Sequence, residues 1–320
     1  MRIAIVGSGA LGLYYGGLLA RASAATGADV HFLMRNDYDH ARRHGIQVDS
    51  IDGDFSIFPA QVYADPGTIG PVDLVLVGLK TTANAAYRAL IGPLYTAGHT
   101  LILSLQNGIG NEPLLAQIFD ADAIVGGVAF LCSNRTGPAQ IEHSRHGGIA
   151  ISPYRSELCR AEMDQLQQLF IESGVHCSLL ESYTALRWRK QVWNVPFNGL
   201  CTVYNCGTGA LLAEVDRRRR VEQIMNEVVE LGCRLESVLE SHSVCVLAAD
   251  EQARLDLIQD QIDKTTQMDD YLPSMLLDQR AGRPLESDSI LFSCLRYRDA
   301  YAPDLPLPAI TRLVNEIERL

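Results

Sequence analysis

The stretch that most constrains the fold lies at the amino terminus. Arg2 to Val6 is a short apolar run of the kind that forms a buried strand, and Leu11 to Ala22 has a helical pattern with small residues on one face. The segment that connects the strand to the helix, and includes the first residues of the helix, consists of Gly7, Ser8, Gly9, Ala10, Leu11 and Gly12. A strand, a glycine-rich turn and a helix in this order predict a dinucleotide-binding turn.

Each glycine of this turn has a physical reason to be there. Gly7 permits the tight turn, Gly9 lets the backbone approach a pyrophosphate, and Gly12 lets the helix pack closely on the sheet. The start of the helix offers N–H groups to the phosphates. The alternative is a glycine-rich turn that binds no ligand.

The end of the second predicted strand, Val30 to Met34, discriminates between the two nicotinamide cofactors. Enzymes that use NAD usually place an acidic residue there to bind the ribose 2′-hydroxyl. This chain has Arg35, whose guanidinium is suited to pair with a 2′-phosphate. The sequence therefore favours NADPH. The alternative is that Arg35 is a solvated loop residue and that Asp37 or Asp39 contacts the ribose.

Two more turns follow predicted strands in the same half. Lys80 comes after the strand Leu74 to Gly78, and Asn107 comes after the strand Thr100 to Ser104. Ligands of open α/β sheets lie at the carboxyl ends of strands. Lys80 is therefore a candidate for the cofactor's ribose or phosphate, and Asn107 for the nicotinamide side or the substrate. Taken alone, each also fits an ordinary loop.

The pattern of apolar residues changes near residue 182. Before it, short apolar runs alternate with helical patterns, which predicts an α/β Rossmann-type doubly wound parallel sheet over residues 1–182. After it, long helical stretches predict an all-α C-terminal domain over residues 183–320. The helices expected there are 184–200, 211–241, 248–264, 274–281, 288–300 and 309–319.

A polar stripe interrupts the first of these helices. Lys190, Asn194 and Asn198 recur every four residues, which places them along one helix face among large apolar side chains. Such groups are costly to bury without partners, and a bound carboxylate and hydroxyl would supply them. The alternative is an exposed face. Pro196 lies within the pattern and is expected to kink the helix.

A second set of polar residues comes later in the chain. Ser274 opens a predicted helix, Glu286 lies in a predicted turn, and Asp288 stands at the start of the next helix. Without further context, Ser274 and Asp288 fit ordinary helix caps, and Glu286 fits a surface acid.

Together these residues resemble the ketopantoate reductase family (2-dehydropantoate 2-reductase), over nearly the whole chain. The resemblance also covers the run Gln106-Asn107-Gly108. It implies an active site in the cleft between a Rossmann domain and a helical domain, with NADPH as hydride donor. It further implies that Lys190 is the general acid and that Glu286 lies near the nicotinamide and the lysine. The residues that it implies for holding the substrate are Asn107, Asn194, Asn198 and Ser274.

Three positions depart from the family pattern on the substrate side. Tyr271 and Thr208 stand where asparagine is common, and the run Asp288-Ser289-Ile290-Leu291-Phe292, with Leu291, lacks the family's Asn-Gly. The expected reaction is NADPH-dependent reduction of 2-dehydropantoate to (R)-pantoate in pantothenate biosynthesis. One alternative is a reductase of another small 2-oxo acid, and the other is a non-catalytic NADPH-binding sensor.

The bulk properties narrow the choice of partners. A formal net charge of −11 argues against general binding to nucleic acid or anionic membranes, and no apolar run approaches the ~20 residues that span a bilayer. The 8 cysteines include no C-x-x-C pair and are expected to be thiols of a cytoplasmic protein. No metal site is expected, because His143 and His146 lack further ligands. The helices over residues 222–260 are a candidate homodimer surface.

Overall fold

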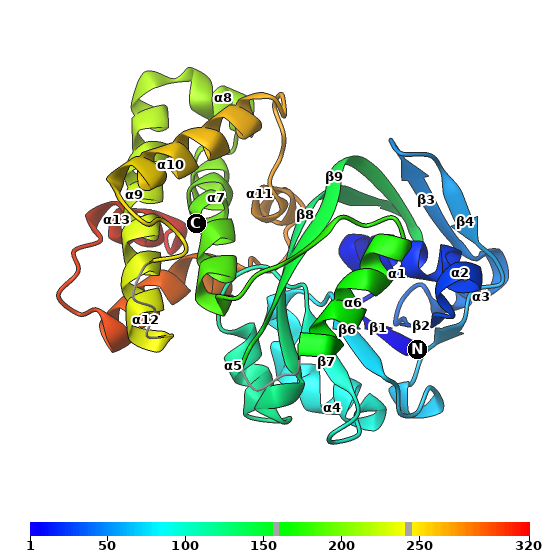
Figure 1. The fold of residues 1–320 in the computed structure, drawn as a ribbon. Coiled ribbons are helices and arrows are strands. Elements are labelled where there is room, and N and C mark those ends of the chain that lie inside the picture. Colours follow the sequence, from blue (N-terminus) through cyan, green and yellow to red (C-terminus); the bar gives the residue numbers. More distant parts are fainter. Residues whose placement is uncertain (156–159, 241–244) are drawn as a thin grey trace. The chain divides into compact units, whose positions relative to one another are not determined.

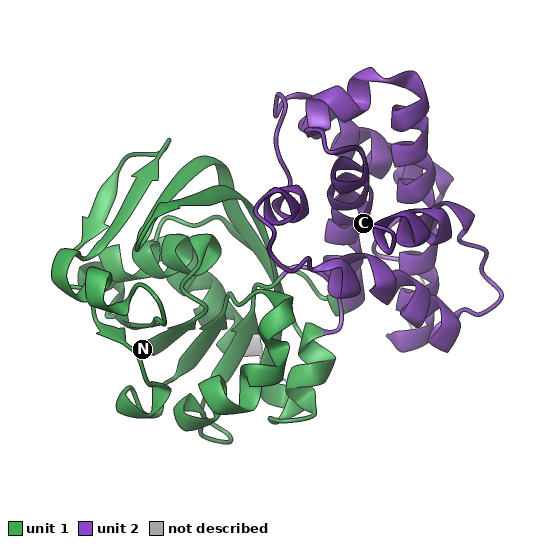
Figure 2. Cartoon of the chain, turned by 180° about the vertical axis from the view of Figure 1, so that it is seen from behind, with its two compact units in different colours: residues 1–106, 111–183 green, residues 107–110, 184–320 purple. Residues whose placement is uncertain are grey.

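The computed structural model describes residues 1–155, 160–240 and 245–320. The chain divides into two compact units (Figure 2). Unit 1 comprises residues 1–106 and 111–183, and unit 2 comprises residues 107–110 and 184–320. The division into domains 1–182 and 183–320 stays a prediction, and it did not anticipate that residues 107–110 belong with the helical unit.

A single mixed sheet forms the centre of unit 1 (Figure 1). Its parallel part has the strand order β7-β6-β1-β2-β5, and in its inner strands β1 and β6 the apolar residues are buried on both faces. The strands of this part are β1 (Arg2–Val6), β2 (Asp29–Leu33), β5 (Val62–Tyr63), β6 (Leu74–Val77) and β7 (Leu101–Ser104).

The rest of the sheet mixes parallel and antiparallel pairs. β8 runs parallel to β7 and antiparallel to β9, and β9 is parallel to both β3 and β10. β3 pairs with β4 in antiparallel fashion. The strands of this part are β3 (Ile46–Ser50), β4 (Phe55–Ile57), β8 (Ile124–Gly137), β9 (Gln140–Pro153) and β10 (Cys177–Leu179).

Helices cover both faces of this sheet, which is the doubly wound arrangement that the sequence predicts. The core against α1 and α6 contains Ile3 and Ile5, whereas the core against α4 and α5 contains Ala4 and Val6. The helices of this unit are α1 (Ala10–Arg21), α2 (Ser23–Thr26), α3 (Tyr38–His44), α4 (Tyr87–Ile91), α5 (Asn111–Ala116) and α6 (Arg160–Glu172). The sequence pattern predicts a helix from Glu157 to Ser173 here, and Glu157 lies outside the described residues.

Unit 2 is helical, as predicted, and its longest helix α9 packs against α8, α10, α12 and α13 (Figure 1). Residues of this unit form one apolar core. The helices are α7 (Tyr183–Tyr204), α8 (Thr208–Ala213), α9 (Val215–Leu239), α10 (Glu251–Thr266), α11 (Ser274–Arg280), α12 (Ser293–Tyr301) and α13 (Pro308–Ile317). No helix in the described part of the chain is long and apolar enough to cross a membrane.

Two helix predictions in this unit were wrong in detail. The helix expected over residues 211–241 is two helices, because Glu214 adopts an extended conformation between α8 and α9. Its expected end, Ser241, lies outside the described residues. The helix expected over 288–300 begins with a π-helical turn, Asp288–Phe292, before α12. Periodicity alone does not distinguish these interruptions from a continuous helix.

The cysteines that the structure describes are thiols, as predicted, and Cys159 lies outside the described residues. Burial raises the pKa of Cys177 and of Cys294 to about 12. A thiol with so high a pKa has almost no thiolate at neutral pH and is a poor nucleophile. These two buried thiols therefore act as small apolar side chains.

Candidate active site

The glycine-rich turn of unit 1 has the tight geometry that its sequence predicts. Gly7 has a positive φ of 101°, and a Cβ there would lie 2.4 Å from the backbone N of Leu79. At Gly12, a Cβ would lie 2.2 Å from the backbone O of Gly7. Both distances are shorter than any real contact, so protein sterics alone require glycine at these two positions.

Gly9 is different, because no heavy atom lies within 4 Å of the position of its missing Cβ. It is the N-cap residue of α1, and no side chain caps that helix. The start of a helix has N–H groups without helical partners, and it favours negative charge. Packing within the protein does not require glycine here, and open space in front of the backbone is what the predicted approach of a pyrophosphate needs.

The sheet topology places the turn beside the other predicted cofactor residues. β2 and β6 are the two neighbours of β1, and all three strands are parallel. The Ser8 Oγ donates a hydrogen bond of 2.9 Å to the backbone O of Leu33, the last residue of β2. Gly7 abuts the Gly78–Leu79 peptide after β6. The turn therefore adjoins the segments that carry Arg35 and Lys80, both of which have exposed side chains.

Asp37, the alternative contact for the ribose, has structural partners in unit 1. Its carboxylate forms an ion pair with Arg135 and accepts a 2.9 Å hydrogen bond from the backbone N of Ala139. The side chain of Asp37 is 12% exposed. A carboxylate that already holds the β8–β9 turn is poorly suited to a ribose hydroxyl, which argues against Asp37, whereas Asp39 and Arg35 both have exposed side chains.

A chain of side-chain amides connects the loops that follow β6 and β7. The Tyr87 hydroxyl donates to the Gln106 Oε1 at 2.5 Å, and the Gln106 Nε2 donates to the Asn84 Oδ1 at 2.8 Å. The Asn84 Nδ2 then donates to the Asn111 Oδ1 at 2.9 Å. These groups fix the loop ends next to Lys80, and of these residues only Gln106 stood out in the sequence.

In unit 2, the polar stripe of α7 is a buried feature. Asn194 and Asn198 are each 2% exposed, so the alternative of an exposed face was wrong for both. Lys190 is half-buried, and its Nζ lies 5.3 Å from the centre of the Trp193 ring. The Trp193 Nε1 donates to the Thr265 Oγ1 at 2.9 Å, which fixes the ring. An ammonium group within about 6 Å of an aromatic ring centre is attracted to the ring, which holds the group in place.

Asn198 joins α7 to α11. Its Oδ1 accepts hydrogen bonds from the backbone N of Met275 at 3.2 Å and from the Ser274 Oγ at 3.5 Å. Because a backbone N–H can only donate, the amide oxygen must face α11, and the Nδ2 donor end is turned the other way. The N-cap of α11 is Pro273, so the alternative of Ser274 as a cap was wrong.

Glu286 and Asp288 also do not fit the alternatives of a surface acid and a helix cap. Glu286 is 2% exposed and is therefore not a surface acid. Its backbone O accepts from the backbone N of Ile290 at 3.1 Å, which leads directly into the π-helical turn. Asp288 does not cap a helix, because Ser287 holds that position and the Asp288 carboxylate pairs with Arg296 at 2.5 Å.

The loop of Asn107 docks on the same π-helical turn. The Ile109 N donates to the Ser289 O at 2.9 Å, and a Cβ at Gly108 would lie 2.6 Å from that oxygen. Gly108 has a φ of 79° and needs to be glycine on both counts. Asn107 therefore belongs to a loop of unit 2, the unit that also contains Glu286 and α7.

The substrate-side departures have distinct surroundings. The Thr208 N donates to the Tyr271 O at 2.9 Å, and the Tyr271 ring lies 6.2 Å from the Trp193 ring. Leu291 is fully buried in the core of the unit. Leu291 is thus a packing residue, whereas Thr208 and Tyr271 form one local structure beside the α7 aromatic residues.

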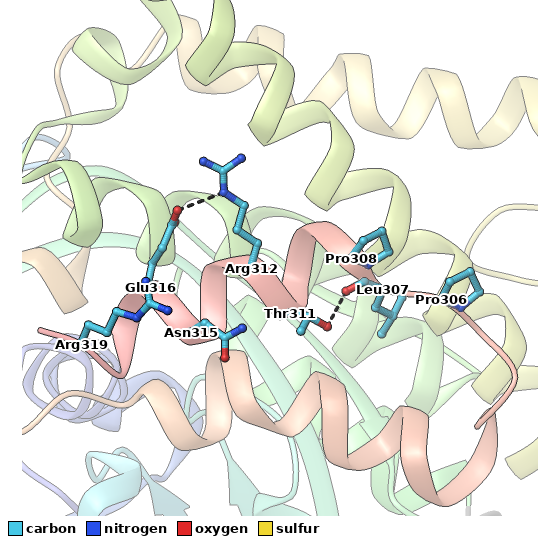
Figure 3. A pocket seen from close by; sticks show the side chains of 8 residues that line it. All are labelled: Pro306, Leu307, Pro308, Thr311, Arg312, Asn315, Glu316 and Arg319. Carbon is cyan, nitrogen blue, oxygen red and sulfur yellow. Dashed lines mark hydrogen bonds and ion pairs between the residues drawn. The ribbon is translucent and has the colours of Figure 1, made fainter.

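A shallow groove of about 790 Å³ lies elsewhere on unit 2, along α13 (Figure 3). Arg312 and Glu316 form an ion pair of 3.1 Å on its wall, and no predicted site residue contributes to its lining. The groove is lined by Pro306, Leu307, Pro308, Thr311, Arg312, Asn315, Glu316 and Arg319.

The fold and these residues define a class, which is a pyridine nucleotide-dependent oxidoreductase with a Rossmann-type unit and a helical unit. The family model described as "Ketopantoate reductase PanE/ApbA" matches residues 3–156, and its C-terminal counterpart matches residues 182–320. The chain belongs to the ketopantoate reductase family.

Known proteins are similar to this chain over its full length. A 2-dehydropantoate 2-reductase of Nostoc sp. is 36% identical over 100% of this chain and 95% of its own length. The crystal structure of 2-dehydropantoate 2-reductase from Geobacter metallireducens is 41% identical, covers 100% of this chain and 99% of that chain, and has a TM-score of 0.90. The fold also matches a D-mandelate dehydrogenase at 20% identity, over 100% of this chain and 98% of that chain, with a TM-score of 0.84.

Proposed function

We propose that this protein reduces 2-dehydropantoate to (R)-pantoate with NADPH, in pantothenate biosynthesis. The observation that carries the proposal is the α7 face, where a half-buried Lys190 shares a helix with the buried amides of Asn194 and Asn198. A cation next to neutral hydrogen-bonding groups suits a small anion with a polarised carbonyl. The names of similar proteins support the same substrate.

The cofactor residues of unit 1 fit NADPH. The turn of Gly7, Ser8, Gly9, Ala10, Leu11 and Gly12 would hold the pyrophosphate. Arg35 would pair with the 2′-phosphate, and Lys80 would contact the ribose or phosphate. Asn107 would hold the nicotinamide side. The cofactor, when bound, supplies the hydride that adds to the keto carbon of the substrate.

Lys190 has the central part in this chemistry. Negative charge develops on the keto oxygen as the carbonyl is reduced, and the ammonium group of Lys190 stabilises that charge and donates a proton to the oxygen. The ring of Trp193 orients the ammonium without neutralising it. A carboxylate at Glu286 would favour the protonated lysine, which is the form that the reaction needs.

The remaining residues hold the 2-oxo acid. The Nδ2 end of Asn198 is a donor suited to a carboxylate oxygen, because its Oδ1 end already accepts from α11. Asn194, Ser274 and Asn107 would bind the rest of the carboxylate and the hydroxyl group. The fixed amide ends of Asn194 and Asn198 would position the keto group, and such positioning is a main contribution of binding residues to rate.

The experiment that tests this proposal is a steady-state assay over a panel of 2-oxo acids, with NADPH and NADH side by side. The expected result is oxidation of NADPH with the highest kcat/KM for 2-dehydropantoate, and a lower value with NADH. NADPH oxidation that is fast only with a different 2-oxo acid would move the protein to the second candidate below.

The second candidate is a reductase of another small 2-oxo acid. Thr208 and Tyr271, which are hydrogen-bonded to each other, stand at family asparagine positions near the α7 aromatic residues. The D-mandelate dehydrogenase with the same fold was crystallised with NADH and anilino(oxo)acetate. Binding of NADPH with no oxidation by any member of the panel would instead support a non-catalytic sensor. A cytoplasmic location and a homodimer remain part of the proposal.

A further inference from the structure

Gln191 on α7 stands immediately after Lys190 and has no part in the proposed chemistry. It is 1% exposed, and both ends of its amide are used. Its Nε2 donates to the backbone O of Ile290 at 2.9 Å, and its Oε1 accepts from the Asn194 Nδ2 at 3.3 Å. It therefore connects a predicted substrate residue to the π-helical turn that follows Glu286.

The direction of these hydrogen bonds is fixed by chemistry. A backbone carbonyl can only accept, so the Nε2 end of Gln191 must face Ile290 and the Oε1 end must face Asn194. Asn194 must then turn its Nδ2 toward Gln191, and its Oδ1 lies on the opposite side of the amide carbon. Both side chains are buried, and a flipped Asn194 would bring two amide oxygens together, which removes a hydrogen bond where water cannot replace it.

We propose that Gln191 is a positioning residue, which fixes the amide of Asn194 in the orientation that the 2-oxo acid requires. Its reference point is the carbonyl of Ile290 in the π-helical turn Asp288–Phe292. Such turns often occur at functional sites. This inference rests on the proposed function, because it assumes that Asn194 contacts the substrate.

The test is a double-mutant cycle on kcat/KM for the 2-oxo acid that the natural protein reduces best. Gln191→Met keeps the volume and removes both hydrogen bonds, and it is expected to lower kcat/KM roughly 10-fold. In an Asn194→Ala background, Gln191→Met is expected to cause no further loss, because Gln191 acts through Asn194. An equal loss in both backgrounds would overturn the inference.

A matched control separates this effect from general damage to the helix. Thr202→Val also replaces a buried polar side chain of α7 by an isosteric apolar one, and the Thr202 Oγ1 has no hydrogen-bond partner in the described residues. Its kcat/KM is expected to equal that of the natural protein. The Kd of NADPH is expected to be unchanged by Gln191→Met, and a loss of NADPH binding as large as the loss of kcat/KM would contradict a positioning role.

Gln191→Glu provides an independent readout, including the case in which Gln191→Met does not fold. An ionised carboxylate cannot donate to the Ile290 carbonyl, whereas a protonated one donates there and accepts from Asn194. Burial raises the pKa of such a carboxyl group. The kcat/KM of Gln191→Glu relative to the natural protein is therefore expected to recover as the pH falls, and a constant ratio over the pH range would overturn the inference.

Failure of the proposed function is distinguishable from failure of this inference. If no 2-oxo acid of the panel supports NADPH oxidation by the natural protein, the proposed function fails and the inference fails with it. If the natural protein is active and the cycle is additive, Gln191 alone loses its role.

Discussion

The predicted ligand contacts of the two units differ in kind. In unit 1 the predicted contacts come mainly from the backbone of the glycine-rich turn. Two of its glycines are sterically required, and open space lies beside the third. The predicted side-chain contacts, Arg35 and Lys80, are exposed. In unit 2 they are buried side chains, such as Asn194 and Asn198, held by directed hydrogen bonds. Unit 1 thus depends on shape and unit 2 on the orientation of polar groups.

The largest expected effect is on the unit 2 side of this comparison. Lys190→Ala is expected to lower kcat by ~10²–10⁴, because a general acid contributes that much to the rate. The Kd of NADPH is expected to stay the same. Arg189→Ala removes the same charge from the adjacent exposed position and is the control. Near-normal turnover of Lys190→Ala would exclude the general-acid role.

The glycines test the claim that unit 1 depends on shape. Gly12→Ala is expected to destabilise unit 1 by about 3 kcal/mol or more, because the added Cβ meets the backbone O of Gly7 at 2.2 Å. At Gly9→Ala the added Cβ meets no protein atom, so this change is expected to lower the melting temperature much less than Gly12→Ala, by no more than the poorer N-cap costs, while it weakens NADPH binding. Calorimetry and a fluorescence titration of NADPH measure the two effects. Normal NADPH affinity in Gly9→Ala would remove Gly9 from the proposed site.

Arg35 tests whether an exposed side chain of unit 1 carries specificity. Arg35→Ala is expected to lower the preference for NADPH over NADH by roughly 10- to 100-fold, the value of one charge-assisted hydrogen bond to a phosphate. Arg42→Ala, in α3, removes an equal charge from another exposed position and is expected to change the preference little. Equal effects of the two substitutions would mean that net charge, and not pairing, sets the preference.

The smallest effect concerns a polar pair of unit 2 outside the predicted site. Burial raises the pKa of Glu316, but the hydrogen bonds and charges of Arg220 and Arg312 together lower it more, so its net pKa lies below the ordinary value. A carboxyl group with a lowered folded pKa adds stability above its unfolded pKa, and this stability is lost as the pH falls through the folded pKa. Arg220→Met is therefore expected to cost about 1–3 kcal/mol at neutral pH and less in acid.

Denaturant unfolding at several pH values measures this cost. Arg218→Met, which removes an exposed ion pair with Glu222, is the control and is expected to cost less than about 1 kcal/mol. Turnover is expected to be unchanged in Arg220→Met. A cost that does not depend on pH would show that Arg220 stabilises the unit through packing on Tyr204 and not through Glu316.

Much of the fold was predictable because its signals are local. The strand, glycine turn and helix at the amino terminus follow from sterics that act within a few residues, and they take the predicted geometry. The break at Glu214 and the π-helical turn at Asp288–Phe292 were missed, because both preserve an approximately helical pattern of apolar residues. The family resemblance was confirmed over both units.

The site was predictable only in part, since its partners are distant in sequence. The spacing of Asn194 and Asn198 indicated a common helix face, but only the structure shows that Asn198 faces Met275 and that Gln191 lies between Asn194 and Ile290. A glutamine three residues before Asn194 was the available signal. Side-chain hydrogen bonds of this kind leave no periodic pattern, so a single sequence does not reveal them.

The loop of residues 107–110 has a consequence for dissecting the molecule. Because Ile109 contributes to the core of unit 2 and its N–H binds the Ser289 carbonyl, the polypeptide enters the helical unit, leaves it and returns near residue 184. A gene truncated to encode only residues 184–320 would produce a fragment with a gap in its apolar interior. The two units therefore cannot be exchanged between relatives by a single crossover near residue 184. A recombinant protein would have to take residues 107–110 and residues 184–320 from the same relative.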